Sequence, residues 1–309
     1  MLPEQAIQPL DTSTVRQLHS GQVIVDIESI VKELIENALD ANAHSIDVKL
    51  VNNGLKLIQV KDDGYGIDEK SRSCMGYRYH TSKITTMDDL ERLKTLGFRG
   101  EALNSICALS KTFQITTKTK QDALAMQYEL DCLGKQTSKK PIGSISHSGT
   151  IISAYQSFFN IPVRRQMAQK TFSFKRIQDM MIKYSLVYPW VRFALTSAVD
   201  AIGVGSARAT HNKWLQPATS GTMKAIATAY GTQLCDMLEH HYVKVTESQL
   251  SMECVLAKPN ADPNIVYRGE RIHIFVNKRP VNYAKCDLKE LVSMARNGFH
   301  RGTYNFFNF

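Results

Sequence analysis

Hydrophobic residues recur at helical spacing just after the first 26 residues. The apolar positions of this segment are Ile27, Ile30, Val31, Leu34, Ile35, Ala38 and Leu39. This period predicts an amphipathic helix over residues 27–43. Glu33, Asn37 and Asp40 fall within about 60° of one another, away from the centre of the apolar face, because each residue advances by about 100°. The helix should therefore be buried on one side and present a polar stripe on another.

Alternating apolar residues predict a β-hairpin after this helix. Residues 46–50 and 57–60 read as strands, and the intervening Asn52-Asn53-Gly54 is a turn signal. Apolar helical spacing returns from Leu103. Other predicted elements are extended segments at 112–118, 125–131 and 150–155 and a helix at 174–187.

A second domain is predicted after the Gly-Ser-rich stretch Gly203-Val204-Gly205-Ser206. The expected domains are residues 1–205 and 206–309. The second would contain a helix at 223–230, strands near 241–257 and 271–277, and a helix near 285–296.

Composition narrows the class of protein. A chain of 309 residues with 43% hydrophobic and 22% charged residues is typical of a soluble globular protein. Neither a signal-like start nor an apolar run long enough to span a bilayer is seen, so secretion and membrane insertion are not expected. Six scattered cysteines without CxxC spacing favour a reducing compartment. The net charge of +9 favours a polyanionic partner, although a solubilising basic surface explains it equally well.

The polar stripe offers two of the groups that nucleotide hydrolysis needs. Such a reaction requires a group acting on water, a divalent cation on the phosphates, and donors that absorb developing charge. Glu33 can act on the water, and Asn37 offers a neutral oxygen to Mg2+ one helical turn later. Considered alone, the same pair is more often a solvated polar face.

Asp62 follows a predicted strand and precedes Gly64 and Gly66. The glycines would let the backbone approach a flat ring while the carboxylate accepts a hydrogen bond from an exocyclic amine, as adenine offers. By itself, an acidic turn after a strand is the commoner interpretation.

Glycines also flank Phe98-Arg99 just before a predicted helix. Gly97 and Gly100 permit unusual backbone angles, and the helix start directs NH groups toward an anion. Thr81-Ser82-Lys83 adds hydroxyls and a cation, although a helix cap with a surface lysine is the competing interpretation. No GxxxxGK[ST] motif is present, which excludes an ordinary P-loop.

Together these segments resemble the GHKL ATPases (gyrase, heat-shock chaperone, histidine kinase and MutL types). Gly97-Phe98-Arg99-Gly100-Glu101-Ala102-Leu103 is similar to the signature of the MutL mismatch-repair branch. Gln22 stands where bacterial members commonly have Glu, and in this respect the chain resembles the eukaryotic postmeiotic-segregation branch. Further resemblance lies in the segments 20–24, 31–37, 79–84, 149–150, 160–164 and 275–280, so that it covers nearly the whole chain.

The resemblance implies an α+β fold: a GHKL-type α/β sandwich, with a mixed sheet and helices on one face, followed by a smaller split βαβ domain. It implies ATP and Mg2+ as cofactors, Glu33 as the catalytic carboxylate and Asn37 as the metal ligand. Asp62 would contact adenine, Gly66 and Ile67 would also bind the nucleotide, and Thr150 would close the adenine end. The implied phosphate lid comprises Thr81, Ser82, Lys83, Gly97, Phe98, Arg99, Gly100, Glu101, Ala102 and Leu103.

The implied function is that of an ATPase subunit in DNA mismatch repair, in which ATP closes an N-terminal clamp on or near DNA. The expected partners are another MutL homologue in a heterodimer, a MutS-type mismatch recognition complex, and DNA bound largely without sequence specificity. A nuclear location follows from the same resemblance. A GHKL chaperone or topoisomerase is disfavoured by the segment 97–103.

One departure leaves a second function open. Family members continue past the Asn277-Lys278-Arg279-Pro280 segment to a strand close to Asp-Val-Asn-Val-x-Pro-x-Lys, whose lysine reaches the terminal phosphate; residues 297–309 do not match it. Hydrolysis should suffer more than ATP binding from this loss, because such a donor matters most as charge develops. The alternative is a DNA-binding or partner-binding module that holds ATP and hydrolyses it poorly.

Overall fold

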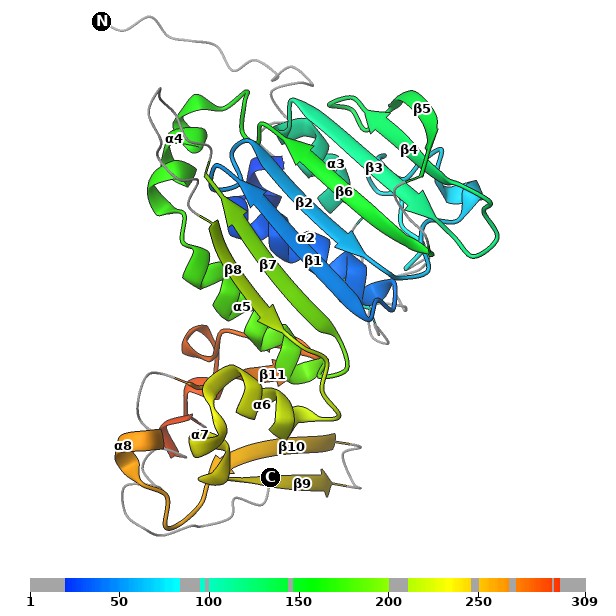
Figure 1. Cartoon of the computed structure of the whole chain (residues 1–309). Coiled ribbons are helices and arrows are strands. Elements are labelled where there is room, and N and C mark those ends of the chain that lie inside the picture. The colour runs from blue at the N-terminus through cyan, green and yellow to red at the C-terminus, as the bar shows by residue number, and fades with distance from the viewer. Residues whose placement is uncertain are drawn as a thin grey trace, which may run out of the picture. The chain divides into compact units, whose positions relative to one another are not determined.

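An eight-stranded mixed sheet organises the larger part of the chain. The computed structural model describes residues 20–83, 95–97, 100–143, 147–199, 211–245, 250–266, 271–290 and 292–294. The strand order is β5-β4-β3-β6-β2-β1-β7-β8 (Figure 1). Strands β1 and β7 pair in parallel, whereas the β1–β2, β2–β6, β3–β6, β3–β4 and β4–β5 pairs are antiparallel. The strands are β1 (Ser45–Val51), β2 (Leu57–Asp62), β3 (Thr112–Lys118), β4 (Ala125–Leu130), β5 (Gln136–Ile142), β6 (Gly149–Tyr155), β7 (Arg192–Ala198) and β8 (His211–Gln216).

The β1–β2 hairpin forms where the turn signal predicts it. Asn52, Asn53 and Gly54 all take positive φ angles, of 49°, 57° and 82°. Asn and Gly adopt this left-handed conformation more readily than other residues, so the three-residue signal is what the turn requires. The alternating apolar residues Ile46, Val48 and Leu50 are buried, as a half-covered strand demands.

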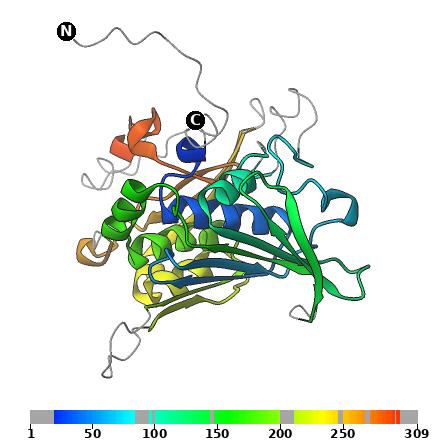
Figure 2. The ribbon, with the colours of Figure 1, turned by 90° about the horizontal axis from the view of Figure 1, so that it is seen from above.

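Helices α2 (Ile27–Asp40) and α3 (Ala102–Leu109) lie on one face of the sheet (Figures 1 and 2). Asp26 begins α2 by accepting a hydrogen bond from the backbone NH of Ser29, whose hydroxyl accepts from the Asp26 NH in return. The helix ends three residues before the predicted Ala43. Asn42 turns left-handed with φ 56°, and the Ala43 NH returns to the Ala38 carbonyl over 3.1 Å, which is a Schellman-type ending.

Two further helices, α4 (Pro162–Thr171) and α5 (Phe174–Val187), follow strand β6 in the sequence. Backbone contacts divide the chain into Met1–Met180 with Arg192–Leu215 and Met181–Val191 with Gln216–Phe309. The last turns of α5 therefore belong to the second unit. The boundary predicted between residues 205 and 206 lies outside the described residues and stays a prediction.

The second unit has its own small core of Leu186, Ala225 and Ile226. Partly buried hydrophobic side chains from several of its elements, including Tyr230 and Leu238, pack against these three. The elements are α6 (Thr222–Tyr230), α7 (Thr232–Asp236), β9 (Leu238–Val245), β10 (Leu250–Ala257), α8 (Pro263–Val266), β11 (Ile274–Val276) and β12 (Arg279–Val281). Strands β9 and β10 form one antiparallel pair, and β11 and β12 form another.

The predicted α+β class with a mixed sheet is confirmed, and α5 and β3 have the predicted bounds. Strands β5, β7 and β8 and helix α4 were missed. Strand β5 is almost wholly exposed and β8 largely so, so neither carries an apolar alternation. The strand predicted over 271–277 is shorter, at Ile274–Val276. Where a helix was predicted near 285–296, a 3-10 turn covers Tyr283–Lys285 and helical residues follow at 288–290 and 292–294; the other residues of that range from 291 on lie outside the described ones. No helix in the described part of the chain is long and apolar enough to cross a membrane.

Candidate functional site

The polar stripe of α2 is directed by the burial of the opposite face. Ile30, Val31 and Ile35 are fully buried, which leaves Glu33, at 27% side-chain exposure, on the open side. The Lys32 ammonium lies 3.4 Å from Glu33 Oε1 and 2.9 Å from Glu36 Oε2. Burial raises the pKa of Glu33, and the neighbouring Lys32 charge opposes that rise. Glu33 is thus a carboxylate whose affinity for a proton is increased, as a general base requires.

Two residues of the polar stripe, on successive turns of α2, contact the ammonium group of Lys83. Lys83 Nζ lies 3.0 Å from Asn37 Oδ1 and 2.6 Å from Asp40 Oδ2. The Asp40 carboxylate also accepts the backbone NH groups of Leu96, at 2.7 Å, and Gly97, at 3.0 Å. Residues on both sides of 84–94 are therefore fastened to the same helix. The predicted lid residues Lys83 and Gly97 are brought to the predicted metal ligand Asn37.

These oxygens suit a cation. Asn37 Oδ1 and Asp40 Oδ2 share one ammonium in the structure, and a hard divalent ion prefers the same carbonyl and carboxylate oxygens. Gly97 lies close by: a Cβ placed there would be 3.0 Å from Lys83 Nζ and 3.6 Å from Asn37 Oδ1. The glycine lets the backbone approach the cation, which a side chain would obstruct.

Asp62 lies buried at the end of β2, with 7% exposure. Its Oδ1 accepts the backbone NH groups of Gly64, at 2.9 Å, and Thr150, at 3.2 Å. Its Oδ2 accepts no hydrogen bond from the residues that the structure describes. Burial raises the pKa of Asp62 to about 6, against the opposing effect of the two NH donors. The carboxylate is held in place and still has one oxygen available to a donor.

The turn after Asp62 lies against the neighbouring strands. Gly66 has φ 79°, and a Cβ there would lie 2.2 Å from the Lys118 carbonyl oxygen, so no other residue fits. The Ile67 NH donates to Thr117 Oγ1 over 2.8 Å, and Thr117 Oγ1 is 3.3 Å from Thr150 Oγ1. Asp62, Gly66, Ile67 and Thr150, which were predicted as one group, are joined through Thr117.

The loop after Asp62 also contacts the end of α2. The Tyr65 NH donates to the Ala41 carbonyl over 3.0 Å, and the Tyr65 hydroxyl is 3.3 Å from the Asp40 carbonyl oxygen. A Cβ on Gly64 would lie 2.6 Å from the Ala41 oxygen. The Asp62 turn and the Asn37–Lys83 contact are therefore neighbouring parts of one region.

The remaining lid residues are held differently. Gly100 has φ 60° and accepts the Tyr79 NH over 3.0 Å, and Glu101 pairs with Arg78 at 2.9 Å. Thr81 Oγ1 accepts the Lys83 NH over 3.1 Å. Ala102 and Leu103 begin α3, and Ser82 is exposed. Phe98 and Arg99 lie outside the described residues, so the phosphate-lid assignment stays a prediction.

Two residues of this region received no role in the sequence analysis: Asp40, although it was placed on the polar stripe, and Thr117. Asp40 lies on the predicted stripe, one turn after Asn37, and its position was a sufficient signal. Thr117 lies one residue before the end of β3, and nothing in the local pattern marks it because its partners Ile67 and Thr150 are distant in sequence.

Comparison with known proteins supports one family. Residues 25–153 match the family described as histidine kinase-, DNA gyrase B-, and HSP90-like ATPase. The chain is 37% identical over 305 residues to human "PMS1 protein homolog 1", covering 95% of this chain and 30% of that protein. It is 35% identical over 292 residues to "DNA mismatch repair protein MutL" of Halothermothrix orenii, covering 91% of this chain and 40% of that protein. The chain thus spans about a third of the length of the curated relatives it matches.

Solved structures agree with these matches. The "N terminal domain of a DNA repair protein" superposes with a TM-score of 0.72 at 27% identity, covering 94% of this chain and 84% of that one. The ADP complex of the Aquifex aeolicus MutL ATPase domain superposes with a TM-score of 0.59 at 24% identity, covering 88% of each chain. The second likeness is one of fold alone.

Because the pKa of Asp62 is raised in the folded chain, this residue should lower the free energy of unfolding as the pH rises. An acid whose pKa of about 6 in the folded chain exceeds its ordinary value of 3.8 contributes stability below pH 3.8, and this stability is lost as the pH rises through about 6. Asp62→Asn removes this dependence. Its free energy of unfolding, relative to that of the unmodified chain, should therefore rise by about 2 kcal/mol between pH 4 and pH 7. Urea denaturation across this range measures it; a difference that stays constant with pH would contradict the prediction.

Proposed function

The chain belongs to the MutL family of histidine kinase-, DNA gyrase B- and HSP90-like ATPases, and on this premise we propose that it binds and hydrolyses ATP in DNA mismatch repair. One observation carries the proposal: Asn37 and Lys83 meet at the end of α2, beside the turn that carries the buried Asp62 carboxylate. The residues that could hold a cation therefore lie beside a carboxylate that has one oxygen available. A nucleotide needs both, the first at its phosphates and the second at its base.

The base end is proposed to recognise adenine. Asp62 Oδ2 would accept a hydrogen bond from the exocyclic amine, while Gly66 and Ile67 bring the backbone against the ring. A guanine would present a carbonyl oxygen at that place, which a carboxylate repels. Thr150, whose NH fixes Asp62, would close this end.

The phosphate end is proposed to bind a triphosphate with Mg2+. The metal, when bound, supplies positive charge to the phosphate oxygens. Asn37 would contribute one oxygen to it, and the ammonium of Lys83 would then pair with phosphate. Thr81, Ser82 and the segment 97–103 would add hydroxyl and backbone donors, which absorb charge as the bond to the terminal phosphate breaks.

Glu33 is proposed to orient and deprotonate the attacking water. Its side chain lies one helical turn before Asn37, and its pKa is raised by burial. A carboxylate with a raised pKa takes a proton more readily, which favours this role at neutral pH.

The biological setting is proposed from the relatives. Their printed names include "DNA mismatch repair protein" and "Mismatch repair endonuclease". We propose a heterodimer with another MutL homologue, contact with a MutS-type complex, largely sequence-independent DNA binding and a nuclear location. The net charge of +9 supports an interaction with DNA phosphates.

Replacing Glu33 separates the enzyme from a module that only holds ATP. Glu33→Ala should lower the single-turnover hydrolysis rate by about 100-fold or more, because general-base catalysis contributes 10²–10⁴-fold. The Kd for ATP should change by less than about threefold, since the carboxylate acts on water. Glu69→Ala, at an exposed surface turn, is the control and should hydrolyse ATP normally. An unmodified chain that binds ATP but hydrolyses it no faster than the Glu33 variant would favour the alternative.

Replacing Asn37 tests the metal. Asn37→Ala should abolish the gain in ATP affinity that Mg2+ gives, because it removes a neutral oxygen ligand. Isothermal titration with ATP in Mg2+ and in EDTA measures this gain. The EDTA series serves as the control for folding and for the base end. Equal Mg2+ gains in the two chains would exclude Asn37 as a ligand.

DNA binding should depend strongly on salt and little on sequence. The affinity for a 40-base-pair duplex should fall at least tenfold between 50 and 200 mM salt, because phosphate contacts release counterions. Two unrelated duplexes of equal length should give similar Kd values in fluorescence anisotropy. A salt-independent Kd, or a large preference for one duplex, would contradict the prediction.

A further inference from the structure

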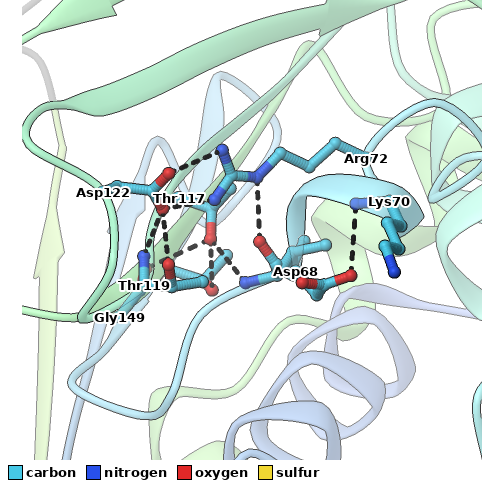
Figure 3. Close-up of polar contacts among 9 residues, drawn as sticks. Asp68, Lys70, Arg72, Thr117, Thr119, Asp122 and Gly149 are labelled. Carbon is cyan, nitrogen blue, oxygen red and sulfur yellow. Dashed lines mark hydrogen bonds and ion pairs between the residues drawn. The ribbon is translucent and has the colours of Figure 1, made fainter.

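A buried arginine supports the base end from behind. Arg72 is only 5% exposed, and its Nε donates to the Ile67 carbonyl oxygen over 2.8 Å. Its two terminal nitrogens face the Asp122 carboxylate, with Nη1 3.1 Å from Oδ1 and Nη2 bonded to Oδ2 (Figure 3). The guanidinium of Arg72 thus joins the backbone of Ile67 to Asp122, which lies 50 positions after Arg72 in the sequence.

Asp122 is itself fixed to the turn between β3 and β4. Its Oδ2 accepts both the NH and the hydroxyl of Thr119, each at 2.7 Å. Hydrogen bonds from Arg72, then those from Thr119, hold the pKa of Asp122 well below its usual range. The carboxylate is therefore charged and immobile at neutral pH, and it orients the arginine through a two-pronged contact.

The backbone of Ile67 is therefore held through both its carbonyl and its NH group. Its carbonyl accepts from Arg72, and its NH donates to Thr117 Oγ1 over 2.8 Å. Thr117 Oγ1 is 3.3 Å from Thr150 Oγ1, and the Thr150 NH donates to Asp62. A continuous series of hydrogen bonds connects Asp122 to the carboxylate at the base end.

Stability alone is a weak reason for such a pair. Burying an arginine and a carboxylate costs desolvation energy that roughly offsets their attraction, and an apolar pair of similar volume often serves as well. A planar guanidinium does provide three hydrogen bonds in fixed directions, which a lysine or an apolar side chain does not. The fixed directions of these three hydrogen bonds suit a role in orienting the backbone of Ile67.

We propose that Arg72, held by Asp122, is a positioning residue that sets the selectivity for the base by fixing the Gly66–Ile67 backbone opposite Asp62. The proposal rests on the proposed function, because it concerns how the same site distinguishes adenine from guanine nucleotides. It assigns no chemical step to Arg72.

Two variants separate positioning from a purely structural role. Arg72→Met removes the donor to Ile67 and leaves Asp122 without its cation. Arg72→Met combined with Asp122→Asn also lacks the donor, but it carries no uncompensated carboxylate and should be the more stable of the two. The Kd values for ATP and for GTP, by competition with a fluorescent nucleotide, and the melting temperature are measured for each.

Both variants should bind ATP about tenfold more weakly, the effect of losing one charge-assisted hydrogen bond that orients the site. The Kd for GTP should change less than about twofold, so that selectivity falls. The melting temperature should drop in the single variant and recover in the double one, while ATP affinity does not recover. Arg176→Met, which removes the same charge from an ion pair with Glu28, should leave the ATP to GTP ratio unchanged.

Three results would overturn the inference. The first is a selectivity in the variants within twofold of that of the unmodified chain. The second is an ATP affinity that recovers together with the melting temperature in the double variant, as a purely structural role requires. The third is an unmodified chain that binds neither nucleotide, which alone would also overturn the proposed function.

Discussion

The packing of α2 against the sheet is the constraint on which the site depends. Four aliphatic side chains, those of Ile30, Val31, Leu34 and Ile35, are at most 1% exposed, and each contributes about 1.5–3 kcal/mol by its burial. A rotation of the helix about its axis would expose them. The apolar face therefore fixes the direction of the polar stripe, and the Asp26 cap and the left-handed Asn42 fix where the helix begins and ends. Segments distant in sequence then dock onto that stripe.

Three carboxylates of the region differ in what surrounds them, and this difference supports the separate roles proposed for them. Asp40 is satisfied by Lys83 and two backbone NH groups, so it orders the chain around Lys83 and Gly97. Asp62 receives two backbone NH groups on a single oxygen, which leaves the other for a ligand. Glu33 faces the open side with only a nearby ammonium, so it can reach a water molecule. The surroundings of each carboxylate therefore suit a different role: Asp40 orders the chain, Asp62 suits the proposed recognition of a ligand, and Glu33 suits the proposed action on water.

The sequence predicted those elements and site residues that are encoded by local patterns of residues. The apolar period locates α2 and α5, the Asn-Asn-Gly signal locates the first hairpin, and the stripe places Glu33 beside Asn37. Strand β7 escaped prediction although its inward residues alternate, because its place beside β1 depends on a parallel pairing across about 150 residues. The contact of Lys83 with Asp40 and that of Arg72 with Asp122 have the same origin. A charged residue in a loop has no local feature that indicates its partner, so only the folded chain reveals these contacts.

The two ends of the site are held by different means, and this asymmetry has a physical consequence. At the base end, Asp62, Ile67, Thr117 and Thr150 belong to adjoining strands or to the turn after β2, so their contacts are bound to the sheet's own hydrogen bonds. At the proposed phosphate end, Asp40 of α2 accepts two backbone NH groups, but the contact with Asn37 is made by the Lys83 side chain, whose flexible ammonium exchanges partners at low cost. A nucleotide would therefore meet a rigid receptor for its base and an adaptable one for its phosphates.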